Sequence, residues 1–125
     1  GVQEVYGFRF GADRIKEMQV GLQYEAINNG QVDVAMGFGT DSQIKQYDLA
    51  VLEDDKQFFP AYHAAVGIHS DVLENNPEIE DITQQLSTRL DDDVMRSLNY
   101  QVDVEGKNVG TVARDWLVDN GLLEG

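Results

Sequence analysis

Cysteine is absent from this 125-residue chain, and its absence removes several kinds of chemistry. Without thiols the protein cannot form disulfides, catalyse through a thiolate or hold zinc with cysteine ligands. Apolar runs are short as well, and none approaches the roughly 18 consecutive apolar residues of a membrane span. No basic, apolar leader opens the chain. We therefore expect neither a membrane span nor a targeting segment within these residues.

Positive charge is scarce. Nine Lys and Arg residues stand against 23 Asp and Glu residues, for a formal net charge of −14. Nucleic acids and anionic membranes are bound mainly through clustered Lys and Arg side chains, so we expect no nucleic-acid partner. The chain is 42% hydrophobic, which is enough to build the core of one ordinary domain.

Catalytic and metal motifs are missing too. There is no GxSxG, P-loop, GxGxxG or HExxH pattern, and Gly37-Phe38-Gly39 is only half of a glycine fingerprint. His63 and His69 lie six residues apart, which favours two ordinary strand histidines over a metal pair. The run Asp91–Asp93 lacks the spacing of a calcium loop and instead predicts a helix start. We expect no enzyme activity, no cofactor and no metal.

Periodicity predicts an α/β layout. Apolar and β-branched runs predict strands at 5–10, 32–38, 48–54 and 61–70. Caps and helical spacing predict helices at 21–30 and 41–47, then from 76–78, from 91–93, and from Asn108 to Gly121.

Aromatic rings gather around one unusual stretch, "EDDKQFFPAY" at 53–62. For Phe58 and Phe59 we favour core packing. Tyr62 follows a proline, and its phenol needs a polar partner or a wet edge. Phe38 ends a predicted strand, where open α/β sheets place ligands. Such rings, without basic neighbours, suit a quaternary ammonium ligand, which gains roughly 0.5–2 kcal/mol per ring.

Two long stretches then point to a family. "GLQYEAINNGQVDVAMGFGTDSQIKQYDLAVLEDDKQFFPAYHAAV" and "MRSLNYQVDVEGKNVGTVARDWLVDNGLL" resemble the substrate-binding proteins of osmoprotectant ABC transporters. The resemblance implies part of a type II periplasmic-binding-protein-like fold, in which two lobes enclose the ligand. It implies a second-lobe α/β segment at 1–53, a hinge or crossover at 54–62, and a mostly helical C-terminal portion completing the first lobe at 63–125. The chain would then be a fragment of such a protein.

The resemblance also implies a ligand site. Tyr62 matches a cage tyrosine of the family, and Phe38 stands where the family has another, which retains the ring but not the hydroxyl. Thr40 and Asp41 match a Thr-Asp pair that lines the cleft or caps the following helix. No basic contact for a ligand carboxylate is identified from the sequence.

The implied function is extracytoplasmic capture of glycine betaine, carnitine, choline or proline betaine for an ABC permease. The whole protein would be a lipoprotein or a fusion to its permease. The alternative is an effector-sensing domain of a regulator with the same fold. Apolar surface left bare by a missing lobe predicts a homodimer of the fragment.

Overall fold

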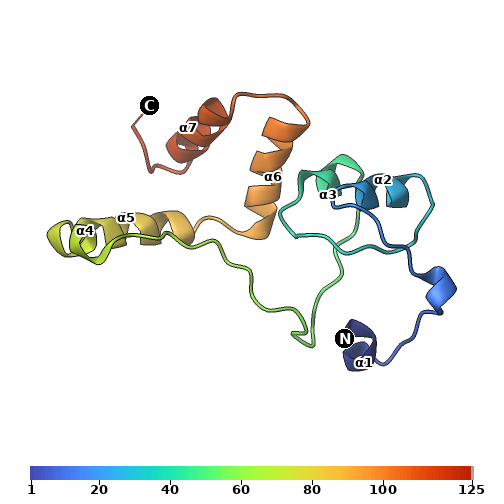
Figure 1. The fold of residues 1–125 in the computed structure, drawn as a ribbon. Helices are drawn as coiled ribbons and strands as arrows, with labels where there is room; N and C mark the ends of the chain where they lie inside the picture. The colour runs from blue at the N-terminus through green and yellow to red at the C-terminus, as the bar shows by residue number, and fades with distance from the viewer. Residues whose placement is uncertain (125) are drawn as a thin grey trace. The chain divides into compact units, whose positions relative to one another are not determined.

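The regular elements of the chain are helices (Figure 1). The computed structural model describes residues 1–124. The helices are α1 (Val2–Tyr6), a 3₁₀ turn η1 (Ala12–Arg14), α2 (Leu22–Asn28), α3 (Ser42–Gln46), α4 (Ser70–Asn75), α5 (Glu78–Ser87), α6 (Asp92–Asp103) and α7 (Val109–Asp119). No helix among the described residues has the length and apolar character needed to cross a membrane.

The chain divides into two compact units. Unit 1 comprises Gly1–Gly37 and Ala50–His63, and unit 2 comprises Phe38–Leu49 and the chain from Ala64 onward. In unit 1 the buried residues are Tyr24 and Ala26 of α2. In unit 2, α3 packs against α6 and α6 packs against α7.

The helices begin and end where local chemistry predicts. The Asp91 carboxylate accepts the Val94 N–H at 2.8 Å and starts α6. The Asn108 side chain accepts the Thr111 N–H at 3.1 Å and starts α7. Gly121 follows α7 with a φ of 67°, a left-handed conformation that suits glycine. The predicted helices of residues 21–30 and 41–47, and those starting at 76–78, 91–93 and Asn108, are confirmed.

The four predicted strands are wrong for the described residues. Helix α1 occupies the start of 5–10, and the segments 32–38, 48–54 and 61–69 run without regular structure until Ser70 opens α4. A strand is stabilised by hydrogen bonds to a neighbouring strand, and no pair of segments here forms such a ladder. Met36 and Leu52 accordingly remain 71% and 75% exposed. β-Branched residues favour strands because they pack well on a half-buried pleated sheet surface, and these segments are not part of such a surface.

Candidate functional site

Residues 38–41 form a tight turn that precedes α3. The Asp41 N–H donates to the Phe38 carbonyl at 3.0 Å. In return, the Asp41 carboxylate accepts the Phe38 N–H at 3.1 Å. The two residues therefore lock one another across Gly39 and Thr40. This turn brings together three of the predicted site residues, Phe38, Thr40 and Asp41.

Asp41 was expected to line the cleft or to cap α3. It holds the N-cap position with extended backbone, but its side chain makes no cap bond into α3. The carboxylate reaches back to the Phe38 N–H instead. The carboxylate of Asp41 thus helps to shape the turn, and its predicted role in the cleft stays a prediction.

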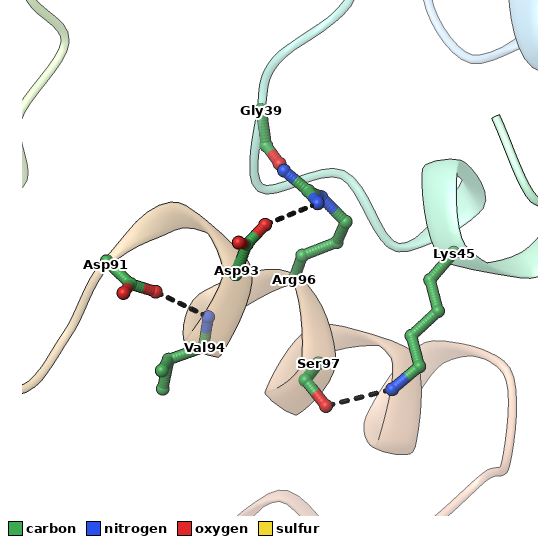
Figure 2. A network of polar contacts seen from close by, with 7 residues as sticks. All are labelled: Gly39, Lys45, Asp91, Asp93, Val94, Arg96 and Ser97. Carbon is green, nitrogen blue, oxygen red and sulfur yellow. Dashed lines mark hydrogen bonds and ion pairs between the residues drawn. The ribbon is translucent and has the colours of Figure 1, made fainter. Parts of the chain in front are cut away.

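Helix α6 holds the same turn from outside. Arg96 donates from Nε to the Gly39 carbonyl at 2.6 Å, and Asn99 donates from Nδ2 to the Thr40 carbonyl at 2.9 Å. The other arm of Arg96 pairs with Asp93 at 2.7 Å. Figure 2 shows the guanidinium reaching the Gly39 backbone on one side and Asp93 on the other. The Arg96 side chain is 17% exposed, so this cation is largely enclosed.

Further polar contacts continue along the face between α3 and α6. Lys45 donates to the Ser97 hydroxyl at 2.9 Å (Figure 2) and lies 5.1 Å from the centre of the Tyr100 ring. Ser42 is 2% exposed and donates to Asp103 at 2.9 Å. The turn therefore adjoins a helix pair, α3 and α6, that is joined by several polar contacts.

A second turn, in unit 1, organises the stretch 53–62 around Asp54. Its carboxylate accepts the N–H groups of Phe58 at 3.0 Å and of Phe59 at 2.8 Å, and also the hydroxyl of Tyr6. Gln57 adopts a φ of 51°, which closes the turn. The rings of Phe58 and Phe59 meet edge to face, with their centres 4.9 Å apart. Asp54 thus holds the backbone that carries these two rings.

The bond between Tyr6 and Asp54 shifts both acidities. Donation from the Tyr6 hydroxyl, and then from the Phe59 N–H, lowers the pKa of Asp54 below its ordinary value of 3.8. The same bond, with the nearby negative charge, raises the pKa of Tyr6 above 10.0. Lys56 makes two contacts with the same tyrosine. Its backbone N–H donates to the Tyr6 hydroxyl at 3.2 Å, and its ammonium group lies 5.1 Å from the centre of the Tyr6 ring.

Tyr62 follows this turn across Pro60 and belongs to unit 1, whereas Phe38, Thr40 and Asp41 belong to unit 2. The residues Phe38 and Tyr62 are 58% and 75% exposed. Their joint role in one site stays a prediction.

Sequence reasoning missed the residues that hold the two turns, namely Arg96, Asn99, Asp54 and Tyr6. A signal existed for Arg96 and Asn99, since residues three apart on a helix share a face. Nothing in the sequence indicated which backbone that face would meet. Two residues that were weighed as metal ligands from the sequence have local roles in the structure. Asp91 caps α6, and His69 Nδ1 accepts the Asp71 N–H at 3.3 Å at the start of α4.

Comparison with known proteins identifies the family. Residues 1–119 match the family described as the substrate binding domain of the ABC-type glycine betaine transport system. The chain is 38% identical to a glycine-betaine-binding protein of Pseudomonas aeruginosa, covering 98% of this chain and 40% of that protein. It is also 38% identical to the carnitine transport binding protein OpuCC of Listeria monocytogenes, covering 90% of this chain and 36% of that protein.

A solved structure shares the fold. The crystal structure of a glycine betaine/carnitine/choline ABC transporter protein matches 97% of this chain and 44% of its own, with 39% identity and a TM-score of 0.86. The chain therefore spans less than half the length of these relatives, and its fold is consistent with part of a periplasmic-binding-protein-like structure. The chain belongs to the substrate-binding domain family of ABC-type glycine betaine transport systems, whose members are binding proteins of transporters and not enzymes.

Proposed function

We propose that this chain contributes to the extracytoplasmic capture of a quaternary-ammonium osmoprotectant, such as glycine betaine, carnitine, choline or proline betaine, for an ABC importer. The observation that carries the proposal is the family match over residues 1–119, together with relatives named for glycine betaine and carnitine. The regulator alternative is not favoured, because the matching family is described as part of a transport system and one relative is named as a carnitine transport binding protein.

The exposed rings support this ligand class. Phe38 and Tyr62 offer π faces, and the chain carries a net charge of −14, which favours a ligand with positive charge. Phe38, Thr40, Asp41 and Tyr62 are the proposed ligand-binding residues. The first turn would fix the backbone of Phe38, and the second would fix the backbone that leads into Tyr62.

The proposal extends to the whole protein. Residues 1–53 would supply second-lobe structure, 54–62 the crossover, and 63–125 the C-terminal portion of the first lobe. The protein would work beside an ABC permease, either as a lipoprotein or fused to it. The permease fusion has a parallel in a relative named ergothioneine transport permease/ergothioneine binding protein EgtU of Helicobacter pylori, which is 38% identical over 98% of this chain and 22% of that protein.

Tyr62→Ala in the full-length protein tests the site. Loss of one ring from a cation cage costs roughly 0.5–2 kcal/mol, so calorimetry should show a loss of affinity for glycine betaine of about two- to thirtyfold. Tyr62→Phe should retain most of the affinity if the π face dominates. A gain from Phe38→Tyr for glycine betaine but not for choline would mean that a hydroxyl there reaches the ligand carboxylate.

Phe10→Ala is the matched control, since Phe10 is an aromatic residue of unit 1 that is 49% exposed and has no proposed contact with the ligand. It should bind like the wild type. Unchanged affinity of a folded Tyr62→Ala protein would remove Tyr62 from the site. Absence of binding by the wild type to any of the four osmoprotectants would refute the proposed function.

We also propose that the isolated chain forms a homodimer. The segments that were predicted as strands leave Met36, Leu52 and Val66 71%, 75% and 61% exposed, and apolar surface of this kind favours association. Light scattering should give twice the mass of one chain, whereas a monomer at high concentration would exclude the dimer.

A further inference from the structure

The turn Phe38–Asp41 has a feature that the proposed function does not explain: each backbone carbonyl from 38 to 40 accepts a hydrogen bond. The turn's own bonds use the Phe38 N–H and carbonyl and the Asp41 N–H. Arg96 and Asn99 take the two carbonyls that remain in the middle, those of Gly39 and Thr40. Every carbonyl from 38 to 40 therefore has a named partner.

The two external donors come from one face of one helix. Arg96 and Asn99 lie three positions apart on α6. They bond the successive carbonyls of Gly39 and Thr40, which lie 57 and 59 residues earlier in the chain. The Arg96 bond is charge-assisted, and such bonds are roughly twice as strong as neutral ones. The pair with Asp93 at 2.7 Å holds the second arm of the guanidinium and restricts its rotation.

An exposed ring needs this kind of support. Phe38 is 58% exposed, so surrounding side chains do not enclose it as they would a core residue. The direction in which its Cα–Cβ bond leaves the chain is set by the backbone of Phe38. A turn held at both central carbonyls fixes that backbone before a ligand arrives, and such preorganisation raises affinity by removing an ordering cost from binding.

We infer that Arg96 and Asn99 of α6 are positioning residues for ligand binding, which hold the Phe38–Asp41 turn in its binding conformation without touching the ligand. This inference rests on the proposed function of Phe38, Thr40 and Asp41.

The test compares Arg96→Ala, Asn99→Ala and Asn99→Asp in the full-length protein, with Ser97→Ala as the matched control. Ser97 lies on the same helix, and its hydroxyl accepts a hydrogen bond from Lys45 of α3 at 2.9 Å instead of bonding the carbonyls of the turn. Calorimetry with glycine betaine and choline measures affinity. Amide hydrogen exchange at Phe38 and Asp41 measures the turn itself.

We expect Arg96→Ala to lower affinity for both probes about tenfold and to speed exchange at both amides. Asn99→Ala should do the same to a smaller extent, by about threefold. The isosteric Asn99→Asp should cost more than Asn99→Ala, because a carboxylate would face the Thr40 carbonyl without a proton to donate. Ser97→Ala should leave affinity within about twofold of the wild type.

The Asn99→Asp variant also separates positioning from packing. Its side chain has nearly the volume of asparagine, so a packing role predicts normal binding. A positioning role predicts that affinity for choline recovers as the pH falls toward about 4, where a protonated carboxyl can donate again. Choline has no titrating group in this range.

Three results would overturn the inference: unchanged affinity in folded Arg96→Ala and Asn99→Asp proteins, an equal loss in Ser97→Ala, or normal amide exchange at Phe38 and Asp41 despite weaker binding. If the wild type binds no osmoprotectant, the proposed function fails instead. The exchange measurement then decides alone whether Arg96 and Asn99 hold the turn.

Discussion

One turn contains the candidate ring of Phe38 and another precedes Tyr62, and groups of opposite polarity hold the two turns. At Phe38–Asp41, donors from a distant helix bond backbone carbonyls. At 54–59, one carboxylate accepts backbone N–H groups from residues four and five positions later in the chain. The first turn is held by tertiary structure, and the second is held mainly by its own sequence.

This difference predicts how each turn responds to damage. The turn Phe38–Asp41 has two external donors, Arg96 and Asn99, as well as its own internal bonds. Loss of one donor therefore leaves the other hydrogen bonds in place. The Asp54 turn depends on a single carboxylate that serves Phe58, Phe59 and Tyr6 together. One substitution there removes three hydrogen bonds.

The largest effect is therefore expected from Asp54→Ala. Amide exchange at Phe58 and Phe59 should accelerate at least about tenfold, because both N–H groups lose their acceptor. Exchange at Phe38 and Asp41, which belong to unit 2, should stay at its wild-type rate. In the full-length protein, affinity for glycine betaine should fall if the turn directs Tyr62.

Asp55→Ala is the matched control, since it removes the neighbouring carboxylate and takes away one negative charge, as Asp54→Ala does. It should leave the Phe58 and Phe59 amides unchanged. Equal acceleration in both variants would mean that net charge, and not the bonds of Asp54, sets the order of this segment.

A smaller effect is expected from pH alone. The pKa of Asp54 is lowered in the fold, so its contribution is complete above 3.8 and is lost as the pH falls through the lowered value. The pKa of Tyr6 is raised, so its contribution is complete below 10.0 and is lost as the pH rises through the raised value. Exchange at Phe58 and Phe59 should report the acid limit, and phenolate absorption should report the alkaline limit.

Tyr6→Phe sharpens this measurement. The variant should lose one phenolate component of the alkaline absorbance, with a midpoint above 10.0, and the pKa of Asp54 should move back toward 3.8. The Phe58 and Phe59 amides should still be protected at neutral pH, since the carboxylate remains. A lost component with its midpoint at or below 10.0 would contradict the bond between Tyr6 and Asp54.

The helices could be predicted from the sequence because their signals are local. Asp91 and Asn108 cap the residues that directly follow them, and the apolar spacing of α5 to α7 lies within each helix. The segments 32–38, 48–54 and 61–69 were mistaken for strands, because β-propensity depends on a partner strand that the local sequence does not contain. For the candidate site, the sequence singled out Phe38, Thr40 and Asp41, and their role in binding stays a prediction. It did not indicate their contacts with Arg96 and Asn99, since those come from more than fifty residues away.

Gly37 and Gly39 flank Phe38, yet they differ in the mutational freedom they allow. A Cβ on Gly37 would overlap the hydroxyl of Tyr24, a ring that is only 5% exposed on α2. A Cβ on Gly39 would meet the carboxylate of the exposed Asp92, whose flexible side chain can swing aside. A designer who wishes to reshape the surroundings of Phe38 thus has one usable position and one closed position. Gly39 can accept a small new side chain, whereas Gly37 is committed to the core of unit 1.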